Sequence, residues 1–258
     1  MSATGTVRQE RLKVADLIDQ IEALPRHGAG SVSGNVLRAI AQHAERIGGV
    51  RNSAETGAGK TTLLFSHLSA NHLVFAIDEG KSISQARNSP LFKAHNVTFV
   101  EGLTQETLPA YHFQHKLQFA LIDGPHGYPF PDLEYFYFYP QIEVGGLLLV
   151  DDIQIPTIRR MFEIIQADEM FRLLEVVDHN MAFFQRTEVP CVILTGGSWC
   201  SQGYNRAYYQ KIYDPSPTTR LHKLYKLFVR CIPNRVKALV PRTIKEGIKG
   251  AFFGRDVP

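Results

Sequence analysis

From Gly49 onward, short apolar runs alternate with helix-forming segments, and no other feature of the sequence restricts the fold as strongly. Continuous apolar runs of this length are typical of buried strands. Because parallel strands need a crossover that is usually helical, this order predicts an α/β fold with a doubly wound, mostly parallel sheet of about seven strands flanked by helices. Ligands of such sheets bind at the carboxyl ends of the strands. We predict strands at residues 73–77, 97–100, 119–122, 147–150, 173–177 and 182–185, and helices between them at 61–70, 82–94 and 157–168.

The pattern changes twice along the chain, which predicts three regions. Residues 1–48 form an N-terminal helical region, with helices expected at 9–25 and 35–47. Residues 49–195 carry the sheet and its ligand site. Residues 196–258 form a linker and a basic helical extension, because the stretch from 196 to 217 is rich in Gly, Ser and Pro.

Composition excludes disorder as the main state of the chain, since 44% of its 258 residues are apolar and 21% are charged. No stretch approaches the roughly 18 consecutive apolar residues of a membrane span, and no apolar run follows a basic start at the N-terminus. The three cysteines match neither a disulfide framework nor a zinc site. We therefore expect a cytoplasmic protein. The cysteines are Cys191, Cys200 and Cys231.

Positive charge is concentrated in residues 206–258, which hold 12 Lys or Arg against 3 Asp or Glu, a net charge of +9. Since the whole chain carries +3, the other residues sum to −6. Apolar side chains at helical spacing lie beside a basic flank here, which predicts a basic amphipathic helix. Such a helix can contact an anionic membrane surface, pack on the protein's own core or lie across a homo-oligomer, and we do not expect nucleic acid as a partner. The apolar residues are Leu221, Leu224, Phe228 and Cys231, and the basic ones are Arg220, Lys223, Lys226 and Arg230.

A glycine-rich turn leads into the first predicted helix of the sheet region as Glu55-Thr56-Gly57-Ala58-Gly59-Lys60-Thr61-Thr62. Glycines let backbone amides approach a ligand at a helix N-terminus, where the dipole favours anionic or strongly accepting groups. Two known nucleotide-binding sequence motifs match this turn only in part. A nucleotide-triphosphate loop ends in Gly-Lys-Thr but needs a glycine where Ala54 stands, and a dinucleotide fingerprint needs one where Thr62 stands.

The acidic residue that follows the next apolar run favours an adenosine-type cofactor. Asp78 lies 19 residues beyond Gly59, at the distance where a carboxylate accepts hydrogen bonds from a ribose diol. A triphosphate loop has no need of that carboxylate. A strand-to-helix turn without any ligand is the remaining alternative.

Three carboxylates and a histidine follow two further strands. Asp123 ends one apolar run, and Asp151 and Asp152 end the next, so these groups can converge at one edge of the sheet. A divalent cation with oxygen ligands, Mg²⁺ above all, relieves their repulsion. His126, three residues after Asp123, can then act as a base on a bound hydroxyl. Alternatively, these residues cap helices and turns.

Together these residues resemble the class I S-adenosylmethionine-dependent methyltransferases, a Rossmann-like group, and within it the metal-dependent macrolide-sugar O-methyltransferases and cephalosporin-hydroxylase-like proteins. The resemblance covers roughly residues 52–187. It rests on three features: the acid Glu55 that opens the cofactor loop, the Asp-x-x-His element from Asp123 to His126, and the paired acids Asp151 and Asp152, which begin 28 residues after Asp123. It implies that the cofactor is held by Glu55, Thr56, Gly57, Gly59, Asp78, Glu101, Gly102 and Asp123, the metal by Asp123, Asp151 and Asp152, and that His126 and Asp123 are catalytic.

The function implied by the resemblance is methyl transfer from S-adenosylmethionine to a hydroxyl of a small molecule or saccharide, assisted by Mg²⁺. A substrate hydroxyl would lose its proton to His126 and attack the sulfonium methyl in line. Two alternatives stay open: a nucleotide-triphosphate-dependent enzyme that uses Gly59, Lys60 and Thr61, and a non-catalytic module tethered to a membrane or a partner.

Overall fold

The computed structural model describes residues 3–25, 32–78, 80–190 and 202–213. The chain divides into two compact units, Met1–Thr195 and Gly196–Pro258. In the second unit the structure describes helix α8 (Gly203–Tyr213). The three cysteines and the predicted amphipathic helix lie outside the described residues. No described helix is both long enough and apolar enough to cross a membrane.

One seven-stranded sheet forms the centre of the first unit, in the order β3-β2-β1-β4-β5-β7-β6. Strands β1 to β5 are parallel, and β7 lies between β5 and β6, antiparallel to both. The chain reverses its direction of winding between β1 and β4, which makes their carboxyl ends the expected ligand crevice. The strands are β1 (Val50–Thr56), β2 (Ser69–Ala76), β3 (Val97–Glu101), β4 (Leu117–Ile122), β5 (Ile142–Val150), β6 (Phe171–Val177) and β7 (Met181–Arg186).

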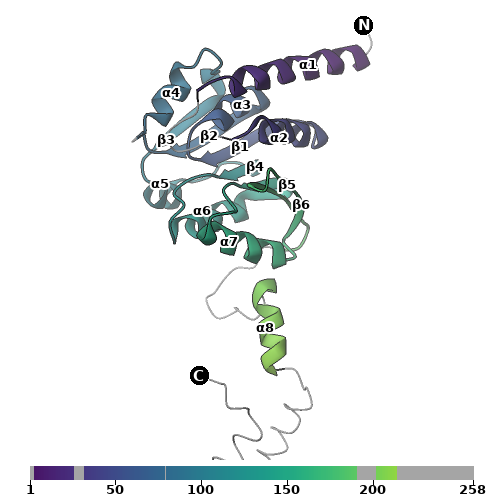
Figure 1. Ribbon diagram of the computed structural model, residues 1–258, viewed down its shortest axis with the longest axis vertical. Coiled ribbons are helices and arrows are strands. Elements are labelled where there is room, and N and C mark those ends of the chain that lie inside the picture. Colours follow the sequence, from purple (N-terminus) through teal and green to yellow (C-terminus); the bar gives the residue numbers. More distant parts are fainter. Residues whose placement is uncertain (1–2, 26–31, 79, 191–201, 214–258) are drawn as a thin grey trace, which may run out of the picture. The chain divides into compact units, whose positions relative to one another are not determined.

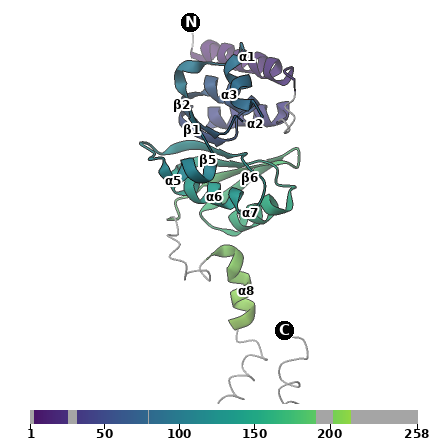
Figure 2. The same ribbon diagram turned by 90° about the vertical axis from the view of Figure 1, so that its left-hand side faces the viewer.

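Helices cover both faces of this sheet, as Figures 1 and 2 show from two directions. On one face lie α1 (Ala3–Glu22), α2 (Gly34–Arg46), α3 (Lys60–Leu68) and α4 (Ser82–Asn88). On the other face lie α5 (Thr104–Ala110), α6 (Phe130–Phe138) and α7 (Pro156–Ala167). Two 3₁₀ turns, η1 (Ala94–Asn96) and η2 (Tyr139–Gln141), precede β3 and β5.

The alternation of side chains along the central strands creates a core on each face. On β4, Phe119 and Leu121 pack toward α2 and α3, whereas Ala120 and Ile122 pack toward α6 and α7. All four are at least 97% buried, and burying a large apolar side chain stabilises the fold by about 1.5–3 kcal/mol. Ile21 of α1 belongs to the first of these cores, so the N-terminal helices are part of the same unit as the sheet.

The predicted fold class is confirmed, and the differences lie in individual elements. Strand β1 was not among the predicted strands. Its buried residues include the polar Ser53, Glu55 and Thr56, so the segment lacks the continuous apolar run from which a buried strand is predicted. The helix predicted at residues 82–94 ends at Asn88, because Ser89 is extended and precedes Pro90. The short helix α5, which contains Pro109, was also missed.

Candidate active site

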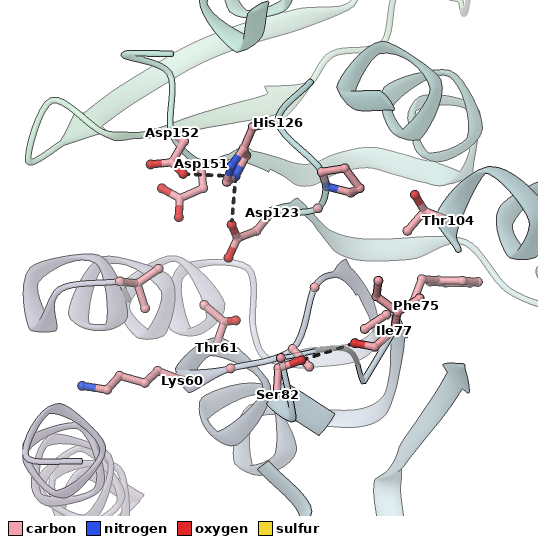
Figure 3. A pocket seen from close by; sticks show the side chains of 18 of the residues that line it. Lys60, Thr61, Phe75, Ile77, Ser82, Thr104, Asp123, His126, Asp151 and Asp152 are labelled. Carbon is pink, nitrogen blue, oxygen red and sulfur yellow. Dashed lines mark hydrogen bonds and ion pairs between the residues drawn. The ribbon is translucent and has the colours of Figure 1, made fainter. Parts of the chain in front are cut away.

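A cleft of about 610 Å³ lies at the carboxyl ends of β1, β2, β4 and β5. The glycine-rich turn forms one side of it, and the carboxylates that follow β4 and β5 form another (Figure 3). The loops after β2 and β3 complete the wall with Ile77 and Leu103, whose side chains are 38% and 40% exposed. The cleft therefore occupies the crevice that the sheet topology predicts.

Gly57 is required by two independent features of the turn after β1. Its φ of +82° is left-handed, and a Cβ at this position would lie 2.3 Å from the backbone oxygen of Asp123. The turn therefore touches the end of β4 directly. Gly59 is the N-cap of α3, whose first backbone N–H groups have no partner within the helix and can serve a ligand.

The two residues before Gly57 point into the protein instead of lining the cleft. The buried carboxylate of Glu55 accepts hydrogen bonds from the hydroxyls of Thr61, at 2.6 Å, and Thr62. The hydroxyl of Thr56 accepts one from the Asp123 N–H at 3.0 Å. These residues support the turn from below, and direct contact of either with a cofactor stays a prediction.

Lys60 does not behave as a phosphate-binding lysine. It is 6% exposed, and its ammonium group donates to the backbone oxygen of Glu22, at the end of α1, over 3.0 Å. In Figure 3 its side chain points away from the carboxylates. A cation at a helix C-terminus is favourable because it satisfies a free carbonyl and opposes the dipole. This geometry argues against the nucleotide-triphosphate alternative.

The two acids predicted for the adenosine part of the cofactor, Asp78 at the ribose and Glu101 near the adenine, contact α4. Asp78 accepts from the backbone N–H of Ser84 at 3.0 Å and from its hydroxyl, and these bonds hold the pKa of Asp78 below its usual value. Glu101 forms an ion pair of 2.7 Å with Arg87. Gly102 lines the cleft. The ribose contact of Asp78 and the role of Glu101 stay predictions.

The structure brings Asp123, His126 and Asp152 together. The Nε2 atom of His126 lies 3.1 Å from an oxygen of Asp152 and 3.9 Å from one of Asp123, and Figure 3 shows the imidazole between them. Asp152 has a left-handed φ of +55°, which Asp tolerates better than bulkier residues. The backbone oxygen of His126 accepts from the hydroxyl of Thr157 at 2.6 Å, which fixes the loop against α7.

Asp151 lines the cleft but makes a separate contact. Its carboxyl accepts from the side-chain amide of Asn180 at 2.6 Å. Asn180 also lines the cleft, and the sequence reasoning missed it. It follows Asp178 and His179, both with positive φ, in the tight turn between β6 and β7. A polar residue in the loop joining two predicted strands was the available signal.

Burial raises the pKa values of Asp123 and Asp151, and their mutual negative charge adds to the effect on Asp151. The Asp123 carboxylate in turn raises the pKa of His126. A positive charge beside these buried carboxyl groups would stabilise their ionised forms.

A second residue missed from the sequence, Glu134 on α6, lies buried behind Asp123. Its carboxyl accepts from the Thr56 hydroxyl at 2.8 Å. A Cβ on Gly124 would lie 2.1 Å from its Oε1 atom, so a larger residue at position 124 would displace this carboxyl group. Burial raises the pKa of Glu134 to about 7, against the opposing effect of the hydroxyls of Thr56 and Thr104.

The chemistry of the acid cluster fits a divalent cation. Asp123, His126 and Asp152 each offer one ligand atom, and these atoms all lie within 4.8 Å of one another. Two carboxylate oxygens suit Mg²⁺, while the imidazole nitrogen suits transition metals better. A cation would also supply positive charge beside these carboxyl groups. The glycine turn likewise fits a cofactor, since Gly59 and Gly80 leave open space where a Cβ would stand.

The sheet order, the glycine turn and the cleft between β1 and β4 are features of the class I S-adenosylmethionine-dependent methyltransferase fold. Residues 29–153 match the model of a family described as a methyltransferase domain. The resemblance to this class seen in the sequence is therefore confirmed, and the enzyme is an S-adenosylmethionine-dependent methyltransferase. No curated protein matches the chain at a significant level.

Solved structures with the same fold include three O-methyltransferases. A putative O-methyltransferase from Klebsiella pneumoniae has a TM-score of 0.54 and 16% identity, over 68% of this chain and 88% of that one. The O-methyltransferase from Bacillus cereus, in complex with SAH, has a TM-score of 0.50 and 20% identity, over 68% and 91%. An O-methyltransferase from Streptomyces achromogenes involved in tomaymycin synthesis, in complex with SAM, has a TM-score of 0.51 and 17% identity, over 68% and 88%. At these identities the likeness shows the fold.

Proposed function

We propose that this methyltransferase transfers the methyl group of S-adenosylmethionine to a hydroxyl of a small molecule or saccharide, with the assistance of a divalent cation. The observation that carries this proposal is the placement of His126 between Asp123 and Asp152, in the same cleft as the glycine turn. The names of the structural neighbours support transfer to oxygen. The resemblance to macrolide-sugar O-methyltransferases supports a saccharide among the acceptors.

His126 is the proton acceptor in this proposal. His126 lines the cleft, and the carboxylates that flank its Nε2 atom stabilise the imidazolium that forms when the ring takes a hydroxyl proton. Asp123 and Asp152, with Asp151 beside them, would hold Mg²⁺, which supplies the charge that makes a hydroxyl more acidic. The turn at Gly57 and Gly59 would hold S-adenosylmethionine, which supplies an electrophilic methyl group.

The remaining work of the site is orientation and exclusion of water. Contact between Gly57 and the backbone of Asp123 fixes the cofactor turn against the acid cluster. The apolar side chains of Ile77 and Leu103 cover part of the wall. In this arrangement the proton acceptor and the methyl donor face one space, so the chain contributes proximity and a pre-organised electrostatic field.

The direct test has two stages. Isothermal titration of the full chain with S-adenosylmethionine should show binding at one site. The purified protein should then form S-adenosylhomocysteine from that cofactor with a panel of sugar and phenolic hydroxyls, faster with Mg²⁺ than with a chelator. Binding without turnover on any hydroxyl, but with turnover on amine acceptors, would refute transfer to oxygen.

The basic segment after residue 206 adds a proposal about location. We propose that the enzyme works in the cytoplasm and that this segment contacts the anionic inner face of a membrane, since its charge of +9 contrasts with −6 for the rest of the chain. Packing of the segment across a homo-oligomer is the alternative.

A further inference from the structure

A continuous set of buried polar side chains lies behind the glycine turn, and the proposed mechanism uses none of it. Glu55, His72, Ser53 and Ser69 connect β1 to the beginning and middle of β2. Each of them is at most 4% exposed. Buried polar groups are costly unless they are paired, so a set of this size in the core needs an explanation.

The hydrogen bonds of this set run in one direction. As a carboxylate, Glu55 only accepts, so the His72 Nε2 atom, 3.1 Å away, is the donor. The Nδ1 atom of a neutral His72 is then an acceptor, which makes the Ser53 hydroxyl, at 2.7 Å, its donor. The Ser69 hydroxyl lies 2.6 Å from that of Ser53. A neutral His72 is therefore held in the tautomer whose Nε2 proton is directed at Glu55.

Glu55 connects His72 to the rest of the glycine-rich turn of residues 55–62, the proposed cofactor turn. Its carboxylate accepts from the hydroxyls of Thr61 and Thr62 in the first turn of α3. The Thr62 hydroxyl also accepts from the backbone N–H of Gly59 at 2.9 Å. Gly59 and Thr61 line the cleft, and two hydrogen bonds connect His72 to Thr61 while three connect it to Gly59.

We propose that His72 is a positioning residue for the cofactor: its Nε2–H orients Glu55, and Glu55 holds Gly59 and the start of α3 in the conformation that binds S-adenosylmethionine. The inference rests on the assignment of this cleft to that cofactor. His72 itself lies outside the cleft and takes no part in methyl transfer.

The chain contains a closely matched control. His43 is 4% exposed, lies 2.6 Å from a carboxylate oxygen of Glu175 and stacks on Phe183 with ring centroids 5.1 Å apart. His72 stacks on Phe65 at 4.9 Å in the same way. The two histidines thus share burial, a glutamate partner and an aromatic neighbour, but neither His43 nor Glu175 lines the cleft.

The experiment measures the Kd of S-adenosylmethionine by isothermal titration of the full chain, with the Tm of each variant recorded beside it. H72F removes both nitrogens, H72N can mimic only Nδ1, and H72Q can still donate to Glu55 from the position of Nε2. We expect H72F and H72N to raise Kd roughly tenfold, equivalent to about 1.4 kcal/mol. We expect H72Q to bind close to wild type, and H43F to lower Tm without changing Kd.

Several results would overturn the inference. Wild-type affinity in H72F or H72N would show that Glu55 needs no donor from His72. Equal weakening in H72Q and H72N, or in H43F and H72F, would reduce His72 to a packing residue. If H72F does not fold, the contrast between H72N and H72Q decides. Absence of binding by the wild-type protein would instead refute the cofactor assignment, and the inference with it.

Discussion

Replacing Glu134 with glutamine should make the protein more stable at neutral and alkaline pH. Burial raises the pKa of this carboxyl from 4.5 to about 7 in the folded state. Ionising Glu134 therefore costs the folded state more than the unfolded one. The full cost is present above pH 7 and is worth about 3 kcal/mol. Glutamine stays neutral and can still accept the hydrogen bond of Thr56.

The sign of the pH dependence follows from the raised pKa. Below pH 4.5 the carboxyl is protonated in both states, so wild type and E134Q should have similar stability. As the pH rises from 4.5 to 7, Glu134 ionises in the unfolded state but not yet in the folded state, so the wild-type protein alone loses stability, and the loss levels off above pH 7. Between pH 5 and pH 8 the difference in unfolding free energy should grow by about 2 kcal/mol in favour of E134Q.

The assay is urea unfolding of both proteins from pH 5 to pH 8, in a buffer with a chelator so that cation binding does not vary with pH. Comparing the two proteins cancels the titration of most other groups. E188Q, which changes an exposed glutamate, is the control and should follow wild type. A difference that stays constant across this range would refute the reasoning about Glu134.

Three further predictions concern the site and the basic segment. H126A should lower kcat by about 10²-fold to 10⁴-fold with little change in the Kd of S-adenosylmethionine, measured by kinetics and titration, and equal loss of cofactor binding would contradict a role as the base. D152N should weaken Mn²⁺ binding, followed by electron paramagnetic resonance, whereas D178N, outside the cleft, should not; equal affinities would remove Asp152 from the metal site. The full chain should sediment with vesicles that contain phosphatidylserine but not with neutral vesicles, and less at high salt; binding that ignores lipid charge would refute the membrane proposal.

The central sheet could be predicted from the sequence because strands buried on both faces appear as continuous apolar runs. This worked for β2 to β7 and failed for β1. Ser53 and Glu55 make β1 look polar, and what stabilises them there, His72 and Ser69, comes from the next strand. Such pairing becomes visible only when the two strands lie side by side.

The same limit applies to the site. Residues directly after strands, such as Asp123 and Asp152, could be placed at one edge of the sheet because parallel strands end together. The direction in which a side chain points could not be predicted. Glu55 faces the first turn of α3, Lys60 faces the end of α1, and Asp151 contacts Asn180 in the turn between β6 and β7.

The contact between Gly57 and the backbone of Asp123 limits how this enzyme can diversify. With 2.3 Å between a Cβ at position 57 and that oxygen, the spacing of the two halves of the cleft is set by main-chain atoms, which substitutions cannot adjust gradually. New acceptor preferences are more easily reached in the loop after β4, where Tyr128, two residues beyond His126, is 76% exposed and can be exchanged at little cost in stability. We therefore expect substitutions to change the exposed loops around the cleft more easily than the spacing between the glycine-rich turn and the end of β4.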